Sequence, residues 1–276
     1  MNKNKIPTVV VIRGGGDLAS GVVFRLHKIG IKTIITELEK PLAVRRLVCF
    51  SEAVYDGEIT IENITARCTS TYKEATSVFT NGEIPVIIDP ECSIRNSKEF
   101  KIVSIIDARM TKREPDLGLD SAPLMIGLGP GFIAGVNCHA VIETNRGHYL
   151  GRVIWDGTAE PDTGIPGRIG NKQQERVIRA PIDGILISHH QIGTRIKEGE
   201  ILASVEGKTI LAPYNGILRG LLRDGSLVFK GMKIGDLDPR DNPDIASHIS
   251  EKSLAIGGGV IEALLTQIEI RDQLWT

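Results

Sequence analysis

The sequence predicts an α/β protein in which a Rossmann-like domain is followed by a β barrel-sandwich hybrid module and a C-terminal helix. Two observations support this prediction. Near the N-terminus, a glycine-rich turn separates an apolar, β-branched run from an amphipathic run, which is the pattern of a βαβ unit. In the C-terminal half, one stretch of sequence recurs 32 residues later. With 276 residues, the chain also exceeds the usual single-domain size of roughly 100 to 200 residues.

A strand, a helix and a second strand are predicted at the start of the chain. Residues 8–13 are mostly β-branched and apolar, which predicts a buried strand. Residues 18–29 carry apolar side chains at helical spacing and end before Gly30, a typical helix-ending residue. Residues 32–37 form the second apolar run. Further strands are expected at 84–89, 101–107 and 124–128, and a further helix at 71–80, where Thr71 and Glu74 fit a capping box.

The pattern changes to alternating polar and apolar residues after a second glycine-rich loop at residues 127–131. Residues 138–144 and 149–155 are therefore predicted to form a hairpin. The stretch 157–174 is rich in Gly, Pro and polar residues, and we place a domain boundary inside it. The expected parts are a Rossmann-like domain with a hairpin extension (1–172), the hybrid module (173–241), and a helical segment (242–276) that packs on the first domain.

The duplication defines the module. A shift of 32 positions places residues 180–186 over 212–218, and glycines again lie over glycines further on. Asp-Gly and Asn-Gly pairs supply the turns, and the two short copies are expected to interlock, as in biotinyl and lipoyl domains. Lys208 lies near the linking hairpin, but residues 205–209 lack the Met-Lys-Met of a carrier. No biotin or lipoate is therefore expected.

The C-terminal segment is expected to hold one apolar helix near residues 260–270. The glycine triplet 257–259 precedes that run. From Asp244 up to the triplet, the segment is expected to be polar and helix-prone.

The composition excludes several classes of function. Thirty-three Lys and Arg residues balance 34 Asp and Glu residues, so no global field attracts nucleic acid or an anionic membrane. Residues 9–12 are too short for a signal-peptide core, and glycines interrupt the uncharged stretch 124–142. The four cysteines show no C-x-x-C spacing, which favours a reducing, cytoplasmic location. Cys138, His139 and His148 are metal-type ligands, but the predicted hairpin separates the two histidines, so no metal site is expected.

The first glycine loop is the leading candidate for ligand binding. Gly14, Gly16 and Ala19 fit G-x-G-x-x-A between a strand and a helix, where backbone N–H groups receive a phosphate. Glu37 ends the second strand, where an acid binds ribose in such folds. Asp17 opposes a pyrophosphate at the mouth of the loop, and a simple tight turn is the alternative. The candidate cofactor-binding residues here are Gly14, Gly15, Gly16, Asp17 and Glu37.

A second set of candidates lies further along the chain. Gly127, Gly129 and Gly131 follow another strand and could approach the same ligand from a neighbouring strand end. Two groups of residues contain basic side chains that could bind an anion. No residue is assigned a catalytic role. The candidates are Arg45 and Arg46, and a cluster in which Arg109, Lys112 and Arg113 lie near Asp107 in the sequence.

Several long motifs resemble one family. The matching stretches are residues 13–21, 44–46, 127–132 and 139–148, which together with the repeat span nearly the whole chain. They are similar to the YqeB-type accessory proteins of the selenium-dependent molybdenum hydroxylase system. The resemblance implies a maturation role like that of xanthine dehydrogenase accessory factors, with a nucleotide or molybdopterin-type cofactor and a molybdenum hydroxylase as partner. It implies no established reaction.

Two other functions stay open. Gly14, Gly16 and Glu37 also fit an NAD(P)-dependent oxidoreductase, although the sequence offers no persuasive acid or base. A non-enzymatic docking protein is the other alternative, because the module lacks a carrier lysine. Whether the protein forms a homo-oligomer is open as well.

Overall fold

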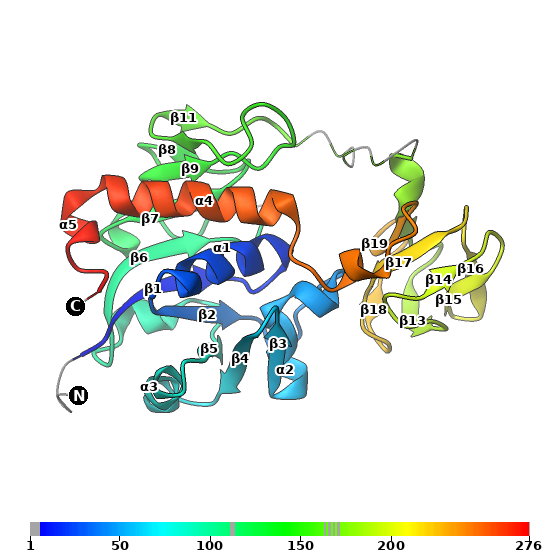
Figure 1. The fold of residues 1–276 in the computed structure, drawn as a ribbon, viewed down its shortest axis with the longest axis horizontal. Coiled ribbons are helices and arrows are strands. Elements are labelled where there is room, and N and C mark those ends of the chain that lie inside the picture. The colour runs from blue at the N-terminus through cyan, green and yellow to red at the C-terminus, as the bar shows by residue number, and fades with distance from the viewer. Residues whose placement is uncertain are drawn as a thin grey trace. The chain divides into compact units, whose positions relative to one another are not determined.

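The computed structural model describes residues 6–110, 114–162, 164, 167, 169 and 172–275 (Figure 1). The chain divides into two compact units. The first, which we call the α/β unit, comprises Met1–Pro41, Phe50–Asp162 and Ser250–Thr276. The second, the β unit, comprises Leu42–Cys49 and Thr163–Ile249. The segment Leu42–Cys49 thus belongs to a unit whose other residues follow more than a hundred positions later.

A nine-stranded sheet forms the centre of the α/β unit, in the order β10-β9-β7-β6-β1-β2-β5-β4-β3. Neighbouring strands are parallel except at the two edges, where β10 and β3 are antiparallel to their neighbours. The parallel strands therefore end along one edge, which we call the carboxyl edge. The strands are β1 (Thr8–Arg13), β2 (Thr33–Glu37), β3 (Glu58–Ile61), β4 (Ile64–Thr69), β5 (Ile84–Ile88), β6 (Lys101–Asp107), β7 (Met125–Leu128), β9 (Ala140–Ile142) and β10 (Val153–Ile154).

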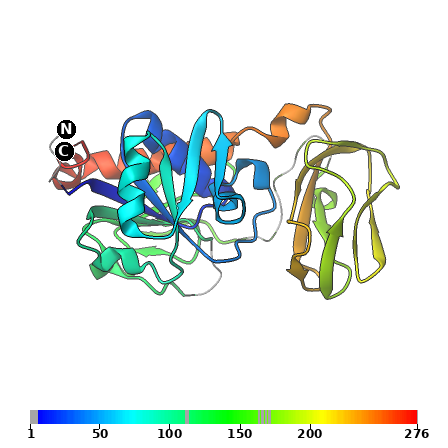
Figure 2. The same ribbon diagram turned by 90° about the horizontal axis from the view of Figure 1, so that it is seen from below.

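Both faces of this sheet are covered. All six residues of β1 are buried, and Val9 and Val11 pack in one core cluster with Ala75 of α3 (Tyr72–Thr80). Val10 and Ile12 alternate to the opposite face, which α1 (Asp17–Lys28) and α4 (Glu251–Thr266) cover (Figure 1). Seen from below, α3 lies in front of the strands (Figure 2). The expected helix at 71–80 is confirmed, with Thr71 accepting a bond from the Glu74 N–H.

Shorter elements complete the α/β unit. A two-stranded ribbon lies outside the main sheet, and single helical turns connect several strands. These elements are β8 (Ile133–Ala134), β11 (Gly157–Thr158), α2 (Ala53–Asp56), α5 (Ile268–Arg271), η2 (Phe50–Glu52), η3 (Ser93–Asn96) and η4 (Leu119–Ser121).

Helices α1 and α4 run side by side in the same direction. Near their first turns, Ser253 donates to Asp17 at 3.1 Å. At the other end, Trp275 donates to the Ile29 carbonyl at 2.9 Å. Glycines make the approach possible, because a Cβ on Gly21 would lie 2.3 Å from the Ser253 carbonyl oxygen, and one on Gly257 would lie 2.7 Å from that of Gly21.

This packing overturns the expected start of the last helix. We expected it near Val260, after the glycine triplet, but α4 begins at Glu251 and includes all three glycines. Close contact with α1 outweighs the low helix propensity of glycine. Gly257 is therefore a packing residue of the helix.

The β unit contains two four-stranded antiparallel sheets, in the orders β12-β19-β17-β14 and β16-β15-β13-β18. Each sheet takes two strands from each 32-residue copy, and the inner side chains form one core cluster that includes Leu186 and Leu218. The strands are β12 (Val177–Arg179), β13 (Gly184–Ser188), β14 (Arg195–Ile196), β15 (Ile201–Val205), β16 (Lys208–Leu211), β17 (Gly216–Leu221), β18 (Leu227–Val228) and β19 (Lys233–Asp238), with η1 (Arg46–Val48), η5 (Gln174–Arg176) and η6 (Pro243–Ala246) beside them.

The fold class expected from the sequence is wrong. We expected a Rossmann-like domain followed by a barrel-sandwich hybrid of the biotinyl or lipoyl type. The chain is instead a mixed α/β protein, with one large, mainly parallel sheet and several antiparallel sheets. The connection from β5 to β6 holds only the 3-10 turn η3, and that from β6 to β7 holds η4. Prolines at 90, 115 and 123 interrupt these connections, and proline breaks helices.

The expected hairpin forms with shorter strands. We expected residues 138–144 and 149–155 to pair as strands, but β9 and β10 pair only Ile142 with Val153 and Val141 with Ile154. Beyond β9, the buried carboxylate of Glu143 accepts bonds from the Asn145 and Glu160 N–H groups.

The contact between α1 and α4 predicts opposite effects for two neighbouring glycines. Gly257→Ala should lower the free energy of unfolding by about 1 to 3 kcal/mol, because the new methyl group must push the helices apart. Gly258→Ala should raise it by about 0.5 to 1 kcal/mol, since Gly258 is exposed with open space around it. Urea unfolding followed by circular dichroism measures both. Equal effects of the two substitutions would contradict the packing described.

Candidate functional site

The carboxyl edge gathers polar residues from several strands. Arg13 ends β1, Glu37 ends β2 and Asp107 ends β6. Asp89 follows β5, and its two carboxylate oxygens accept the N–H groups of η3 at 2.8 Å. Because ligands of open α/β sheets bind outside the carboxyl ends of the strands, this edge is the candidate site.

The first glycine loop follows β1, and the fold requires two of its glycines. Gly14 has a φ of +92°, and an added Cβ would lie 3.2 Å from the Arg109 side chain. A Cβ on Gly15 would lie 2.7 Å from the Ser51 nitrogen, which donates to the Gly15 carbonyl at 2.9 Å. Gly16 differs. Its φ is −73°, which any residue adopts, and no atom lies within 4 Å of the added Cβ.

Gly16 is also the N-cap of α1, and no side chain caps this helix end. The first-turn N–H groups and the helix dipole therefore favour an anion here. Asp17 is the acidic residue of the first turn, and its carboxylate accepts a bond from Ser253 of α4. Asp17 is thus tied to the neighbouring helix.

Glu37 holds the loop to the end of β2. One carboxylate oxygen accepts the Gly15 N–H and the other the Leu38 N–H, both at 2.7 Å. Burial raises the pKa of Glu37, while these two N–H groups and the charge of Arg109 lower it. The sequence placed Glu37 beside the loop, and the structure brings them into contact.

Two arginines and two aspartates form a charge cluster at the ends of β1 and β6, which we call the edge cluster. The nearly inaccessible Arg13 makes two bonds to Asp116, at 2.6 and 2.7 Å, and a third to the Pro90 carbonyl. Arg109 bonds to the fully buried Asp107 and to Asp116 at 2.6 and 2.7 Å. These arginines hold the pKa of Asp116 well below its usual range.

Arg109 is therefore not the spare cation that the sequence suggested. Its partners Asp107 and Asp116 balance the charges of Arg13 and Arg109, so the edge cluster carries no excess charge. The other two basic residues of this region, Lys112 and Arg113, lie outside the described residues.

Packing and backbone geometry account for the second glycine loop without a ligand. A Cβ on Gly127 would lie 2.1 Å from the Phe132 ring, and one on Gly129, at a φ of +74°, would lie 2.4 Å from the Thr144 hydroxyl oxygen. Gly131 has a φ of +100°. The loop still lies near the first one, since Met110 contacts Gly129 while the adjacent Arg109 contacts Gly14.

Arg45 and Arg46 belong to the β unit, and its own carbonyls engage them. Arg45 donates to the carbonyls of Ile245 and His248 at 3.1 and 2.9 Å. Arg46 donates to the Leu221 carbonyl at 2.8 Å. Both arginines anchor the segment Leu42–Cys49 to the rest of the β unit.

The cysteines and histidines that suggested a metal have structural roles. Burial raises the pKa of Cys138 to about 11, and His139 accepts the Met125 N–H at 2.9 Å. Among the described residues, no group of three or more metal-type side chains comes together. Lys208 is an exposed strand residue that begins β16.

Sequence reasoning missed two residues at this edge. Asp116 joins both arginines of the edge cluster, and Lys252 lies in the first turn of α4. Burial and the charge of Arg146 lower the pKa of Lys252, against the opposing effect of Asp17 and two other acids. Lys252 is 236 positions after Gly16, so no local pattern could connect them.

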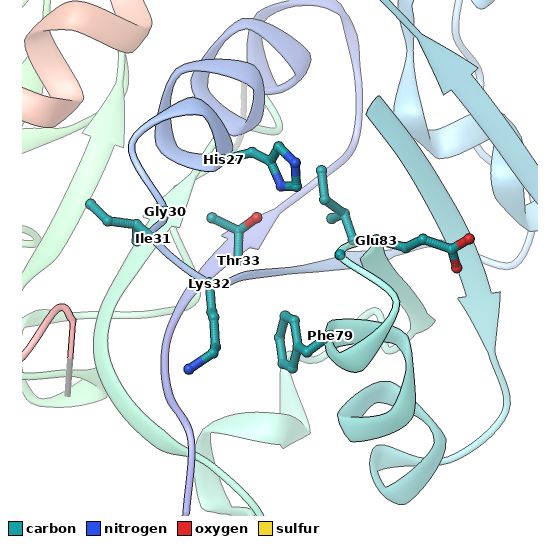
Figure 3. A pocket seen from close by; sticks show the side chains of 9 residues that line it. His27, Gly30, Ile31, Lys32, Thr33, Phe79 and Glu83 are labelled. Atoms are coloured by element: carbon teal, nitrogen blue, oxygen red, sulfur yellow. The ribbon is translucent and has the colours of Figure 1, made fainter. Parts of the chain in front are cut away.

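A small cavity lies at the opposite edge of the sheet, near the amino ends of β2 and β5 (Figure 3). Its volume is about 120 Å³, and His27, Thr33 and Phe79 are among its lining residues. The Thr33 hydroxyl is buried without a hydrogen-bond partner among the described residues. A space this small suits at most a few water molecules, and it lies at the other edge of the sheet from the glycine loops.

No protein-family model matches the chain. The chain is 49% identical over 257 residues to the uncharacterised protein YqeB of Escherichia coli K12, a match covering 93% of this chain and 47% of that protein. The chain is a relative of YqeB. This confirms the predicted resemblance to YqeB-type proteins, and the name of that protein states no function. The chain spans about half the length of YqeB.

Among solved structures, an aspartoacylase family protein from Mesorhizobium loti aligns with 84% of this chain and 85% of its own. The identity is 10% and the TM-score is 0.25, so this similarity carries no functional argument. In the described part of the chain, no helix has the length and apolar character needed to cross a membrane.

Asp116 offers a test of the edge cluster. Asp116→Asn should lower the free energy of unfolding by about 2 kcal/mol, because it leaves the buried Arg13 with weaker partners. Asp120→Asn is the matched control, since Asp120 is exposed on η4, and it should change stability by less than about 0.5 kcal/mol. Thermal and urea unfolding at neutral pH measure both. Equal stability of the two variants would contradict the cluster.

The same residue predicts an effect of pH. The pKa of Asp116 is lowered in the folded state, so its stabilisation is present above the unfolded value of about 3.9 and is lost as the pH falls below it. The wild-type protein should therefore lose more stability than Asp116→Asn between about pH 5 and pH 2. Urea midpoints across this range measure the difference, and parallel curves would contradict the prediction.

Proposed function

We propose that the α/β unit binds an anionic, nucleotide-like ligand at the first glycine loop, and that the protein is a maturation factor for a selenium-dependent molybdenum hydroxylase. The observation that supports binding is the geometry of Gly16. The maturation role rests on the resemblance to YqeB-type accessory proteins and on the 49% identity to YqeB.

The geometry of Gly16 favours a ligand-binding loop over the alternative interpretation, a simple tight turn. Gly14 and Gly15 are accounted for by backbone conformation and by contact with Ser51, whereas Gly16 has ordinary dihedral angles and open space at its Cβ position. Glycine at such a position is useful when a ligand approaches the backbone closely. Gly16 also stands at the uncapped start of a twelve-residue helix, where a phosphate is favoured.

The neighbouring groups suit the two polar ends of a nucleotide. The first-turn N–H groups of α1 would receive the phosphate, because the edge cluster offers no excess positive charge. Each carboxylate oxygen of Glu37 uses one lone pair on a backbone N–H and keeps another for a ribose hydroxyl. Gly14, Gly15, Asp17, Gly127, Gly129 and Gly131 would shape the loops around the ligand, whereas Arg45 and Arg46 serve the β unit.

A molybdopterin-type cofactor would bind at this site through its phosphate. Burial raises the pKa of Cys68, Cys92 and Cys138, which disfavours the thiolate form that binds metals. The protein would hold the phosphate or nucleotide part at Gly16 and leave the metal to the pterin. When bound, such a cofactor supplies the molybdenum that the partner hydroxylase requires.

An NAD(P)-dependent oxidoreductase is the second candidate, favoured by the position of Glu37 beside the loop. The same binding experiment separates the two functions. NADH would bind at the loop of an oxidoreductase, whereas a maturation factor would retain a pterin-type cofactor from the cell and ignore NADH.

The binding test uses native mass spectrometry of the purified protein and calorimetric titrations with NADH, GTP and CTP. We expect a retained or titrated ligand, and at least a tenfold weaker Kd for Gly16→Val with its Tm nearly unchanged. Gly258→Val is the control, because it adds the same side chain at another position with open space. Absence of any ligand, or equal binding by Gly16→Val, would overturn the proposal.

A further inference from the structure

One sheet of the β unit exposes large apolar side chains on its outer side. These five side chains are between 43 and 56% exposed, and we call them the bare face. Exposed apolar patches on a protein surface mark interaction sites. The bare face consists of Ile185 and Ile187 of β13, Ile201 of β15, Leu211 of β16 and Leu227 of β18.

The strand register places these side chains on one side of the sheet. Ile185 pairs with Leu227, and Ile201 pairs with Leu211; paired residues point to the same side. Ile187 follows Ile185 by two positions, so it points the same way. The alternate residues, including Leu186, Ala203 and Ile210, are buried in the core cluster on the inner side.

The duplication provides an internal comparison for this face. Residue 185 corresponds to residue 217 after the shift of 32 positions. Leu186 and Leu218 both point into the core, so Ile185 and Ile217 both point outward. Ile185 is 43% exposed, but Ile217 is only 1% exposed. The same position is therefore bare on one sheet and covered on the other.

The covering material on the second sheet is a segment of the chain itself. A Cβ on Gly220 of β17 would lie 2.7 Å from the Val44 carbonyl oxygen. Arg46 donates to the Leu221 carbonyl of the same strand, and η6 also packs on β17. The outer face of the second sheet therefore binds an irregular segment that carries apolar and basic side chains.

We propose that the bare face docks a segment from the polypeptide that corresponds to the part of YqeB outside the matched region. The match takes up 47% of YqeB, so about half of that relative lies beyond it. The proposed docking is the same whether that polypeptide is joined to this chain or separate from it. The segment contributes apolar side chains, as Leu42–Cys49 does on the other sheet. The proposal does not depend on ligand binding by the α/β unit.

The experiment mixes this chain with the portion of E. coli YqeB outside the matched region, produced separately. Sedimentation velocity and calorimetry at about 0.1 and 1 M NaCl measure the complex. We expect binding that persists at high salt, because the bare face carries no charge. Leu227→Asp and Leu211→Asp, which alter the two ends of the face, should each weaken the Kd at least tenfold.

Lys197→Asp is the matched control. Lys197 is exposed beside β14 of the other sheet, and its substitution should leave the Kd within twofold. Unchanged melting curves confirm that the variants are folded, and the two separate aspartate variants guard against a local defect in either one. Absence of a complex, or equal binding by all variants, overturns the proposal. Self-association of this chain that Leu227→Asp abolishes also overturns it, because a second copy would then cover the face.

Discussion

The close contact of α1 with α4 is the constraint on which the α/β unit depends. Without side chains at Gly21 and Gly257, the two helices approach to backbone contact, and the end of the chain returns to the first βαβ segment. This contact places Ser253 and Lys252 beside the first turn of α1. The surroundings of the glycine loop are therefore assembled from residues more than 230 positions apart.

The carboxyl edge combines a neutral charge cluster with an uncapped helix end. Arg13 and Arg109 are bonded to Asp107 and Asp116, which fixes the ends of β1 and β6. Glu37 fixes the loop to β2 by accepting the Gly15 N–H. With these groups already paired, the helix N-terminus at Gly16 is an anion-favouring feature of the described part of this edge.

Local patterns predicted the central strands well, because burial on both faces gives an apolar run. Residues 8–13 and 101–107 match β1 and β6 from end to end, and Glu37 was correctly placed beside the loop. Non-local packing explains the errors. The glycine triplet was taken to precede the last helix, and Arg109 was taken as a free cation. The error in the fold class has a local cause, because prolines interrupt the connections that hold η3 and η4.

Amide hydrogen exchange at the first turn of α1 tests the central claim most directly. The claim is that a nucleotide-like ligand binds where Gly16 begins the helix. With the retained ligand, or with GTP or CTP in excess, the Asp17, Leu18 and Ala19 amides should exchange more slowly while the Thr33 and Phe79 region is unchanged. Unchanged exchange at α1, or protection confined to the small cavity at the opposite edge, would contradict it.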